Sequence, residues 1–191
     1  MGTEVRRVPD GGVLAHREGI RRVYARTFTA PPWAEDEQAA DRFLERLAQD
    51  AERPGFTAAL ALDAGEPVGF ATAWRTPETF PGGRCYPQVG AALGPRRTAQ
   101  WLCGALEVDE LALEPAARGG GLGAALLAAV TEPAADGRCW LLTSARAGSA
   151  LAFYRRLGWV QVTHPAPEGG GAAVFLGPRH PGRDGGVVGE V

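Results

Sequence analysis

One stretch of the sequence places an arginine and four glycines directly before an apolar segment that favours a helix. In ARGGGLGAALLAAV, residues 117–130, Arg118 precedes glycines at 119–121 and 123. The first turn of a helix carries backbone N–H groups without intrahelical partners, and together with the helix dipole they attract anions. Positions without side chains let a phosphate approach those groups closely. The stretch therefore indicates an anion cradle of backbone N–H groups from 119 to 124, with Arg118 adding positive charge.

Three other interpretations of the glycines were weighed against the cradle. A P-loop requires Gly-Lys-Ser or Gly-Lys-Thr, which does not follow here. A dinucleotide-binding G-x-G-x-x-A pattern fits Gly119, Gly121 and Ala124, but EPAAR separates it from the preceding strand, and the next apolar run, CWLLT, ends without an acidic ribose ligand. A purely structural role, in which glycines let the helix start lie against a neighbour, stays open, although four glycines in five positions exceed that need.

The elements that must position this cradle follow from apolar periodicity. Helical periods predict helices over residues 14–29, 34–51, 122–132 and 149–157. Alternating or continuous apolar runs predict strands over residues 56–62, 67–74, 105–113, 139–143, 159–163 and 172–176. The first two strands form a predicted hairpin, and a glycine-rich turn, EGGG at 168–171, joins the last two. Residues 76–98 are rich in Pro, Gly and Arg and predict a long connection. The order predicts an α/β (α+β) domain over 1–176, on one mixed sheet, followed by a flexible tail at 177–191.

Composition limits the classes of protein that the chain can represent. Its 191 residues suffice for one domain with a substantial core, and its net charge of −2 argues against a general nucleic-acid footprint. Three separated cysteines predict neither a disulfide framework nor a zinc site, and they fit a reducing cytoplasm. The three histidines are scattered, so no metal is expected. No signal peptide and no membrane-length apolar run is visible. We therefore expect a cytoplasmic protein that binds neither nucleic acid nor membrane.

Two sequence blocks together resemble a known family. ELALEPAARGGGLGAALL resembles the acetyl-CoA signature of the GNAT superfamily of N-acetyltransferases, whose core motif R/Q-x-x-G-x-G/A matches residues 118–123. Downstream, SALAFYRRLGWVQV resembles the family segment A-x-x-F-Y-x-x-x-G-F/W at Ala150, Phe153, Tyr154, Gly158 and Trp159. The two blocks, with the strand at 139–143 between them, cover residues 105–163. The order of elements extends the resemblance loosely to about residue 13.

The resemblance implies a fold and a cosubstrate. The fold would be a single GNAT-like domain with a mixed, mostly antiparallel sheet of six or seven strands, splayed at the cofactor site and flanked by about four helices. Acetyl-CoA would place its pyrophosphate on the cradle and its pantetheine amides along the strand edge at Leu111 and Leu113, and a backbone N–H near Ala112 or Leu113 could polarise the thioester carbonyl. The implied cofactor-binding residues are Leu111, Ala112, Leu113, Arg118, Gly119, Gly120, Gly121, Leu122, Gly123, Ala124 and Ser149.

One position departs from the family pattern. Many relatives carry an asparagine that contacts the cofactor three residues before the Ala150 position, where this chain has Ala147. Ser149 or Arg146 could substitute, or backbone and water could suffice. The departure weakens one expected cofactor contact and leaves the pyrophosphate cradle intact.

Proton transfer in the implied reaction requires an acid and a base. In the family, the tyrosine that matches Tyr154 points toward the thioester sulfur, so Tyr154 is the expected proton donor; the alternative is an aromatic packing residue beside Phe153. Glu107 is the expected base, with Asp109 and Glu110 as further candidates. Strand alternation places Glu107 and Asp109 on one face and Glu110 on the other. The alternative for these acids is a solvated strand face.

The implied activity is transfer of an acetyl group from acetyl-CoA to a primary amine by direct attack, without a metal. The acceptor would be a small-molecule or peptide amine, and Trp33, Phe80, Tyr86 and Trp101 are candidate walls of its site. Because dimers are common in the family, a homodimer is also compatible with the resemblance. A hypothesis of another class is a non-catalytic acyl-CoA-binding sensor or regulatory module.

Overall fold

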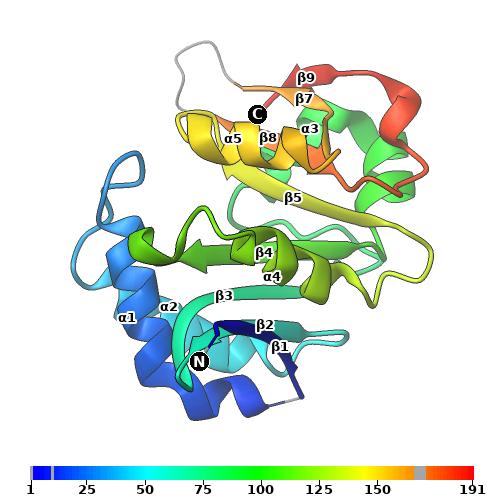
Figure 1. Ribbon diagram of the computed structural model, residues 1–191. Helices are drawn as coiled ribbons and strands as arrows, with labels where there is room; N and C mark the ends of the chain where they lie inside the picture. The colour runs from blue at the N-terminus through cyan, green and yellow to red at the C-terminus, as the bar shows by residue number, and fades with distance from the viewer. Residues whose placement is uncertain (1, 10, 166–170) are drawn as a thin grey trace. The chain divides into compact units, whose positions relative to one another are not determined.

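The computed structural model describes residues 2–9, 11–165 and 171–191 (Figure 1). The α-helices in these ranges are α1 (Arg17–Phe28), α2 (Ala39–Asp50), α3 (Tyr86–Arg97), α4 (Leu122–Thr131) and α5 (Gly148–Arg156). The strands are β1 (Glu4–Val8), β2 (Thr57–Asp63), β3 (Glu66–Arg75), β4 (Leu106–Leu113), β5 (Cys139–Ser144), β6 (Val160–Gln161), β7 (Thr163–His164), β8 (Ala172–Leu176) and β9 (Val188–Glu190). Seven strands form one mostly antiparallel sheet, and β7 and β9 form a second. The mixed α/β fold with a mostly antiparallel sheet is confirmed.

The chain divides into two compact units. Unit 1 contains Met1–Trp74 and Val108–Pro133, and unit 2 contains Arg75–Glu107 and Ala134–Val191. Strand β4 contains one of the boundaries, so it begins in unit 2 and ends in unit 1.

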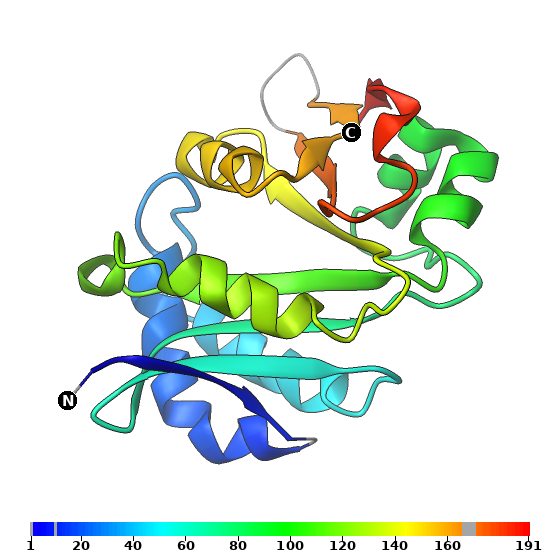
Figure 2. The ribbon, with the colours of Figure 1, turned by 45° about the vertical axis from the view of Figure 1, so that its right-hand side comes forward.

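Unit 1 has helices on both faces of its strands (Figure 2). β2 pairs antiparallel with both β1 and β3, with Leu60 opposite Phe70. On one face, α1 and α2 build an aromatic core in which the ring of Phe43 stacks on that of Phe70 at 5.4 Å. On the other face, a Cβ at Gly69 would lie 3.2 Å from a methyl of Leu126, which belongs to α4. Gly69 therefore allows α4 to pack closely against the strand.

Unit 2 is likewise covered on both faces of β8. β8 pairs antiparallel with β5 and with β6, and Trp140 of β5 lies opposite Leu176. Val89 and Leu93 of α3 join Trp140 in one buried cluster. On the other face, the rings of Tyr154, in α5, and Phe175 lie 5.8 Å apart.

The segment that follows β8 makes specific contacts in unit 2. Gly182 and Gly185 pack against the indole of Trp101, where a side chain at either position would collide with the ring. β9 pairs in parallel with β7, and the Val191 N–H donates to the His164 carbonyl at 3.0 Å. These contacts are made by glycines and by backbone hydrogen bonds. The periodicity of apolar residues in the sequence does not indicate contacts of this kind.

Several predicted elements differ from the observed ones. The predicted connection over residues 76–98 is wrong because this range contains the whole of α3, which breaks at Gly94 (φ +77°) before Pro95. The predicted helix over 34–51 begins at Ala39, and the one over 14–29 begins with a 3-10 turn, Gly12–His16. The predicted strand over 159–163 divides into β6 and β7. β1 was not predicted. Most of the turn at 168–171 lies outside the described residues.

No helix within the described ranges is both long and apolar enough to cross a membrane.

Candidate functional site

The glycine segment links the end of β4 to the start of α4 in unit 1. A 3-10 turn, Pro115–Ala117, follows the strand, and Gly121 is the N-terminal cap residue of the helix. Gly119 has φ +89° and Gly121 has φ +81°, both in the region that favours glycine. These two glycines are therefore required by the path of the backbone itself.

Gly120 has a different explanation. Its φ is not positive, and a Cβ built on it would meet no atom within 4 Å. Neither backbone conformation nor crowding among the described residues accounts for a glycine here. The residue is exposed, so its missing side chain leaves the surface open to an external group.

The start of α4 presents unoccupied N–H groups beside Gly120. The first intrahelical bond runs from the Ala125 N–H to the Gly121 carbonyl at 3.0 Å, and no described side chain caps the helix. The N–H groups of the first turn, at 122–124, therefore lack intrahelical acceptors. Leu126 and Val130, both buried, fix the helix against the strands. An open surface, free N–H donors and the helix dipole fit the pyrophosphate of coenzyme A.

Arg118 closes the turn that leads into this cradle. Its Nε donates to the Leu113 carbonyl at 3.2 Å, and the Thr27 hydroxyl donates to the same oxygen at 3.3 Å. A carbonyl oxygen has two lone pairs, so both acceptor positions of Leu113 are used. The side chain expected to supply charge to the cradle thus also joins the end of β4 to its own loop.

Glu114 anchors the same turn to a helix and a strand. Its side chain is only 11% exposed and accepts hydrogen bonds from Arg26 at 3.0 and 3.1 Å, while the Nε of Arg22 lies 3.6 Å away. Its backbone N–H donates to the Val68 carbonyl of β3 at 2.9 Å. Arg26 lies 88 residues away from Glu114 in sequence, so the sequence alone indicates no role for this glutamate.

Asp109 and Glu110 form an ion-pair network with α2. The Nη2 of Arg46 lies 3.5 Å from the Asp109 carboxylate and 3.3 Å from that of Glu110, although alternation predicts opposite faces for these neighbours. Asp50 lies 3.6 Å from Arg46 and 2.6 Å from Arg53. Burial, and secondarily the Asp109 charge, raises the pKa of Asp50 against the pull of the arginines. The Asp109 side chain is 3% exposed, so this part of β4 is not a solvated acidic face.

Glu107 lies in unit 2 and contacts a tyrosine. The Tyr86 hydroxyl, at the start of α3, lies 3.0 and 2.9 Å from the two carboxylate oxygens of Glu107, and both residues are buried. The sequence indicates Tyr86 only as a candidate wall of the acceptor site. The contact depends on α3, which the sequence does not predict.

α5 carries the remaining predicted residues of unit 2. Tyr154 is buried, with its ring 5.2 Å from Phe153, 6.1 Å from Trp159 and 5.8 Å from Phe175. Ser149 is exposed in the first turn of the helix, and Ala147, just before it, is fully buried. These contacts show aromatic packing around Tyr154, and its role as a proton donor stays a prediction.

The predicted site residues therefore fall into two groups. Unit 1 contains residues 109–113 of β4 together with the cradle at 118–124, and unit 2 contains Glu107, Ser149 and Tyr154. Two candidate wall residues take part in packing: Trp33 lies edge-on to Phe28 at 5.2 Å, and Trp101 contacts the C-terminal glycines.

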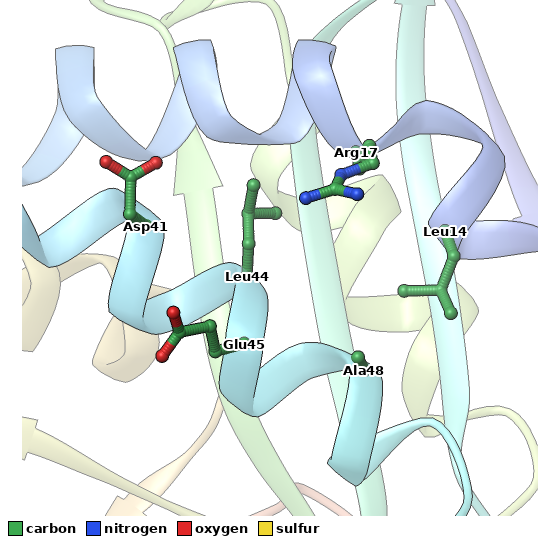
Figure 3. A pocket seen from close by; sticks show the side chains of 6 residues that line it. All are labelled: Leu14, Arg17, Asp41, Leu44, Glu45 and Ala48. Carbon is green, nitrogen blue, oxygen red and sulfur yellow. The ribbon is translucent and has the colours of Figure 1, made fainter.

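A pocket in unit 1 shares no residue with the cradle. It has a volume of about 420 Å³ and is lined by Leu14, Arg17, Asp41, Leu44, Glu45 and Ala48. Figure 3 shows Asp41 and Leu44 pointing from α2 toward α1. Asp41 is bound by Arg21 at 2.5 Å, so its charge is balanced. Across residues 2–9, 11–165 and 171–191, no group of three His, Cys, Asp or Glu side chains could hold a metal ion.

The class of protein follows from comparison with known families. The model of the acetyltransferase (GNAT) family matches residues 17–159, so the chain belongs to this family. Comparison with curated proteins finds no match.

Solved structures with the same fold are N-acetyltransferases and related enzymes. The PaiA N-acetyltransferase from Thermoplasma acidophilum, in complex with coenzyme A, is 14% identical with a TM-score of 0.63, over 93% of this chain and 99% of that one. The ribosomal-protein-S18-alanine N-acetyltransferase from Escherichia coli is 15% identical with a TM-score of 0.59, over 94% and 95%. The histone acetyltransferase HPA2 and related acetyltransferase from Corynebacterium glutamicum is 20% identical with a TM-score of 0.60, over 92% and 95%.

Proposed function

We propose that this GNAT acetyltransferase transfers an acetyl group from acetyl-CoA to a primary amine. The observation that carries the proposal is Gly120, whose missing side chain leaves the N-terminus of α4 open although neither conformation nor crowding requires a glycine. Membership of the GNAT family supports the donor, and the N-acetyltransferases among the structural neighbours support an amine as acceptor.

The cradle binds the donor through backbone groups. The N–H groups at 119–124 hold the pyrophosphate, and the Leu111 edge of β4 pairs with the pantetheine arm. Both acceptor positions of the Leu113 carbonyl are used, so Leu113 would contribute its N–H. Ser149, exposed at the start of α5, is a further candidate contact. Acetyl-CoA supplies an activated acetyl group as a thioester.

Proton transfer completes the proposed reaction. An ammonium acceptor gives up two protons as it becomes an amide: one passes to Glu107 and then to water, and one ends on the sulfur of CoA through Tyr154. The amine nitrogen bonds the acetyl carbon, and the carbon–sulfur bond breaks. Tyr154 gives its own proton to the sulfur and regains one from the nitrogen that has attacked, which is the second proton lost by the amine. Asp109 and Glu110 are less suited as base because a proton on either would weaken its interaction with Arg46.

The acceptor, the cellular location and the oligomeric state are proposed from the chemistry of the residues and from the resemblance to the family. We propose a small-molecule or peptide amine, attracted by the acidic residues of β4. We propose a reducing cytoplasm as the place of action, because the three cysteines are widely separated in sequence and Cys103 and Cys139 are buried thiols. A homodimer is the proposed assembly, and size-exclusion chromatography with light scattering tests it.

The test combines binding with turnover. Acetyl-CoA at saturation should raise the melting temperature, because a ligand of the native state stabilises it. The protein is then assayed with an alkylamine, a polyamine, an aminoglycoside and a peptide with a free N-terminus, following CoA thiol release and product mass. Acetylation of one of these above the protein-free rate is expected. No release with any amine between pH 6 and 10 would contradict the proposal.

Ala147 favours a second candidate function. At the position where many family members carry a cofactor-contacting asparagine, this chain has a fully buried methyl group. A non-catalytic acyl-CoA-binding module would tolerate that loss. The same experiment separates the two functions: a melting shift with acetyl-CoA but no acetylated product would favour the binding module.

A further inference from the structure

A tyrosine outside the predicted site holds the carboxylate that the proposed reaction uses as base. The Tyr86 hydroxyl lies 2.9 and 3.0 Å from the two oxygens of Glu107, so its single proton is shared between both. Tyr86 is 5% exposed and Glu107 is 4% exposed. A hydrogen bond between groups this buried competes little with water and is strong when one partner is charged.

The ring of Tyr86 is fixed by its aromatic neighbours. Phe80 contacts it edge-on, with centroids 5.3 Å apart and planes at 85°, and Trp140 lies 6.3 Å away. Trp140 is fixed in turn, because its indole N–H donates to the Thr76 hydroxyl at 2.8 Å. The packed rings therefore hold the Tyr86 hydroxyl in a defined position relative to the Glu107 carboxylate.

Burial and the phenol act on Glu107 in opposite directions. Removing a carboxylate from water favours its protonated form, whereas a hydrogen bond donated to the carboxylate favours its charged form. A base must be unprotonated before the amine arrives. The two-oxygen contact also fixes the plane of the carboxylate, which orients its remaining lone pairs.

We propose that Tyr86 is a positioning residue that keeps Glu107 ionised and oriented for proton removal from the acceptor amine. This inference rests on the proposed function. Arg84 and Cys85 directly precede Tyr86 at the start of α3, and Asp109 follows Glu107 by two residues in β4, so these are the neighbouring ionisable groups in sequence. The other rings around Tyr86, Phe80 and Trp140, are uncharged.

The test replaces the phenol by a phenyl ring. Tyr86→Phe keeps the packing and removes the hydroxyl, so protonation of Glu107 should become easier. The acid limb of the kcat/KM profile for the best amine of the panel should move upward by about one pH unit. At pH values well above the acid limb, the kcat of Tyr86→Phe should lie much closer to that of the wild type than it does on the limb itself. Should Tyr86→Phe fail to fold, Phe80→Leu loosens the ring and should give a smaller shift in the same direction.

Tyr24 provides a matched control. It is another buried tyrosine that donates to a glutamate, Glu35, at 2.8 Å, and it lies in unit 1. Tyr24→Phe removes the same chemical group and should leave the acid limb in place. Glu107→Gln should abolish the limb, and adding Tyr86→Phe to it should change the profile no further.

A second readout does not depend on turnover. Protein with 13C-labelled glutamate carboxyls is titrated by NMR, and the Glu107 signal is assigned by its loss in Glu107→Gln. Tyr86→Phe should raise the titration midpoint of that signal, and an unchanged midpoint would overturn the inference. A raised midpoint with an unchanged kinetic limb would also overturn it while leaving the acetyltransferase function standing. A wild type without turnover on any amine overturns the proposed function, and with it the role of Tyr86.

Discussion

Three adjacent glycines in the cradle have different physical reasons to be glycine. At Gly119 and Gly121 the backbone adopts positive φ angles that L side chains rarely adopt. At Gly120 φ lies outside the left-handed region and the space is open, so no described residue requires a glycine, and the proposed pyrophosphate contact is the reason that we offer for it. The sequence alone favours one explanation for all of them, the approach of a ligand, because a run of glycines does not reveal which φ angles are positive.

This division makes opposite predictions for two substitutions. Gly120→Val should leave the melting temperature unchanged and weaken acetyl-CoA binding at least tenfold, because its side chain would occupy the space of the pyrophosphate. Gly121→Ala should lower the free energy of unfolding by about 1–2 kcal/mol, because alanine is strained at positive φ. Thermal unfolding and isothermal titration calorimetry measure the two effects. Equal losses of stability in both variants would contradict the distinction.

At the scale of elements, the helices and strands with clean apolar periods were predicted, and β1, α3 and β9 were not. β1 has the sequence EVRRV, and three of its five residues are exposed, so its pairing with β2 leaves little apolar signal. α3 contains two prolines and two glycines, which normally break helices, yet Val89 and Leu93 bury one side of it. Packing against the sheet outweighs weak local propensity, and sequence patterns do not report packing.

The anchoring of β4 onto α1 gives a prediction about two glutamates. Glu114→Gln should destabilise the protein by about 1–2 kcal/mol, because it weakens hydrogen bonds from Arg26 to a carboxylate that is only 11% exposed. Glu132 is the matched control, since it pairs with Arg7 but is 69% exposed. Glu132→Gln should cost well under 1 kcal/mol. Urea unfolding of both variants measures the difference, and similar losses would show that burial of Glu114 does not matter.

At the scale of the whole molecule, the contiguous part of the candidate site could be predicted from sequence and the rest could not. The cradle and the end of β4 lie within residues 109–124, so spacing alone brings them together. Contacts with long sequence separation were missed: Tyr86 with Glu107, Arg46 with Asp109 and Glu110, and Arg26 with Glu114. Each requires the path of the chain in space, which periodicity does not give.

The C-terminal segment contains a buried histidine, His180, whose contacts predict a loss of stability in acid. The Nε2 of His180 lies 2.9 Å from the Trp101 carbonyl, and its Nδ1 accepts the Gly182 N–H at 2.9 Å. A neutral ring with its proton on Nε2 satisfies both bonds, and a second proton on Nδ1 would break one of them. Burial lowers the pKa of His180, and the charge of Arg138 lowers it further, against the hydrogen bond to Trp101.

The sign of the pH effect follows from this lowered pKa. Between the folded and unfolded pKa values the folded state binds fewer protons, so stability is full above about pH 6.5 and falls as the pH drops toward the folded value. Urea unfolding between pH 7.5 and 5 should show this loss, and His180→Gln should flatten it. His164 is exposed, and His164→Gln should leave the slope as in the wild type. An equal slope in His180→Gln would remove His180 from this role.

The division of β4 between two units has a consequence for how the protein is made and how it can be cut. The chain passes from one unit to the other after residues 74, 107 and 133, so neither unit is a continuous stretch. During synthesis, unit 1 can gain its last strand and α4 only after 33 residues of unit 2 have left the ribosome. No single cut can release either unit whole. Truncation at a single point therefore cannot isolate unit 1, which contains the cradle.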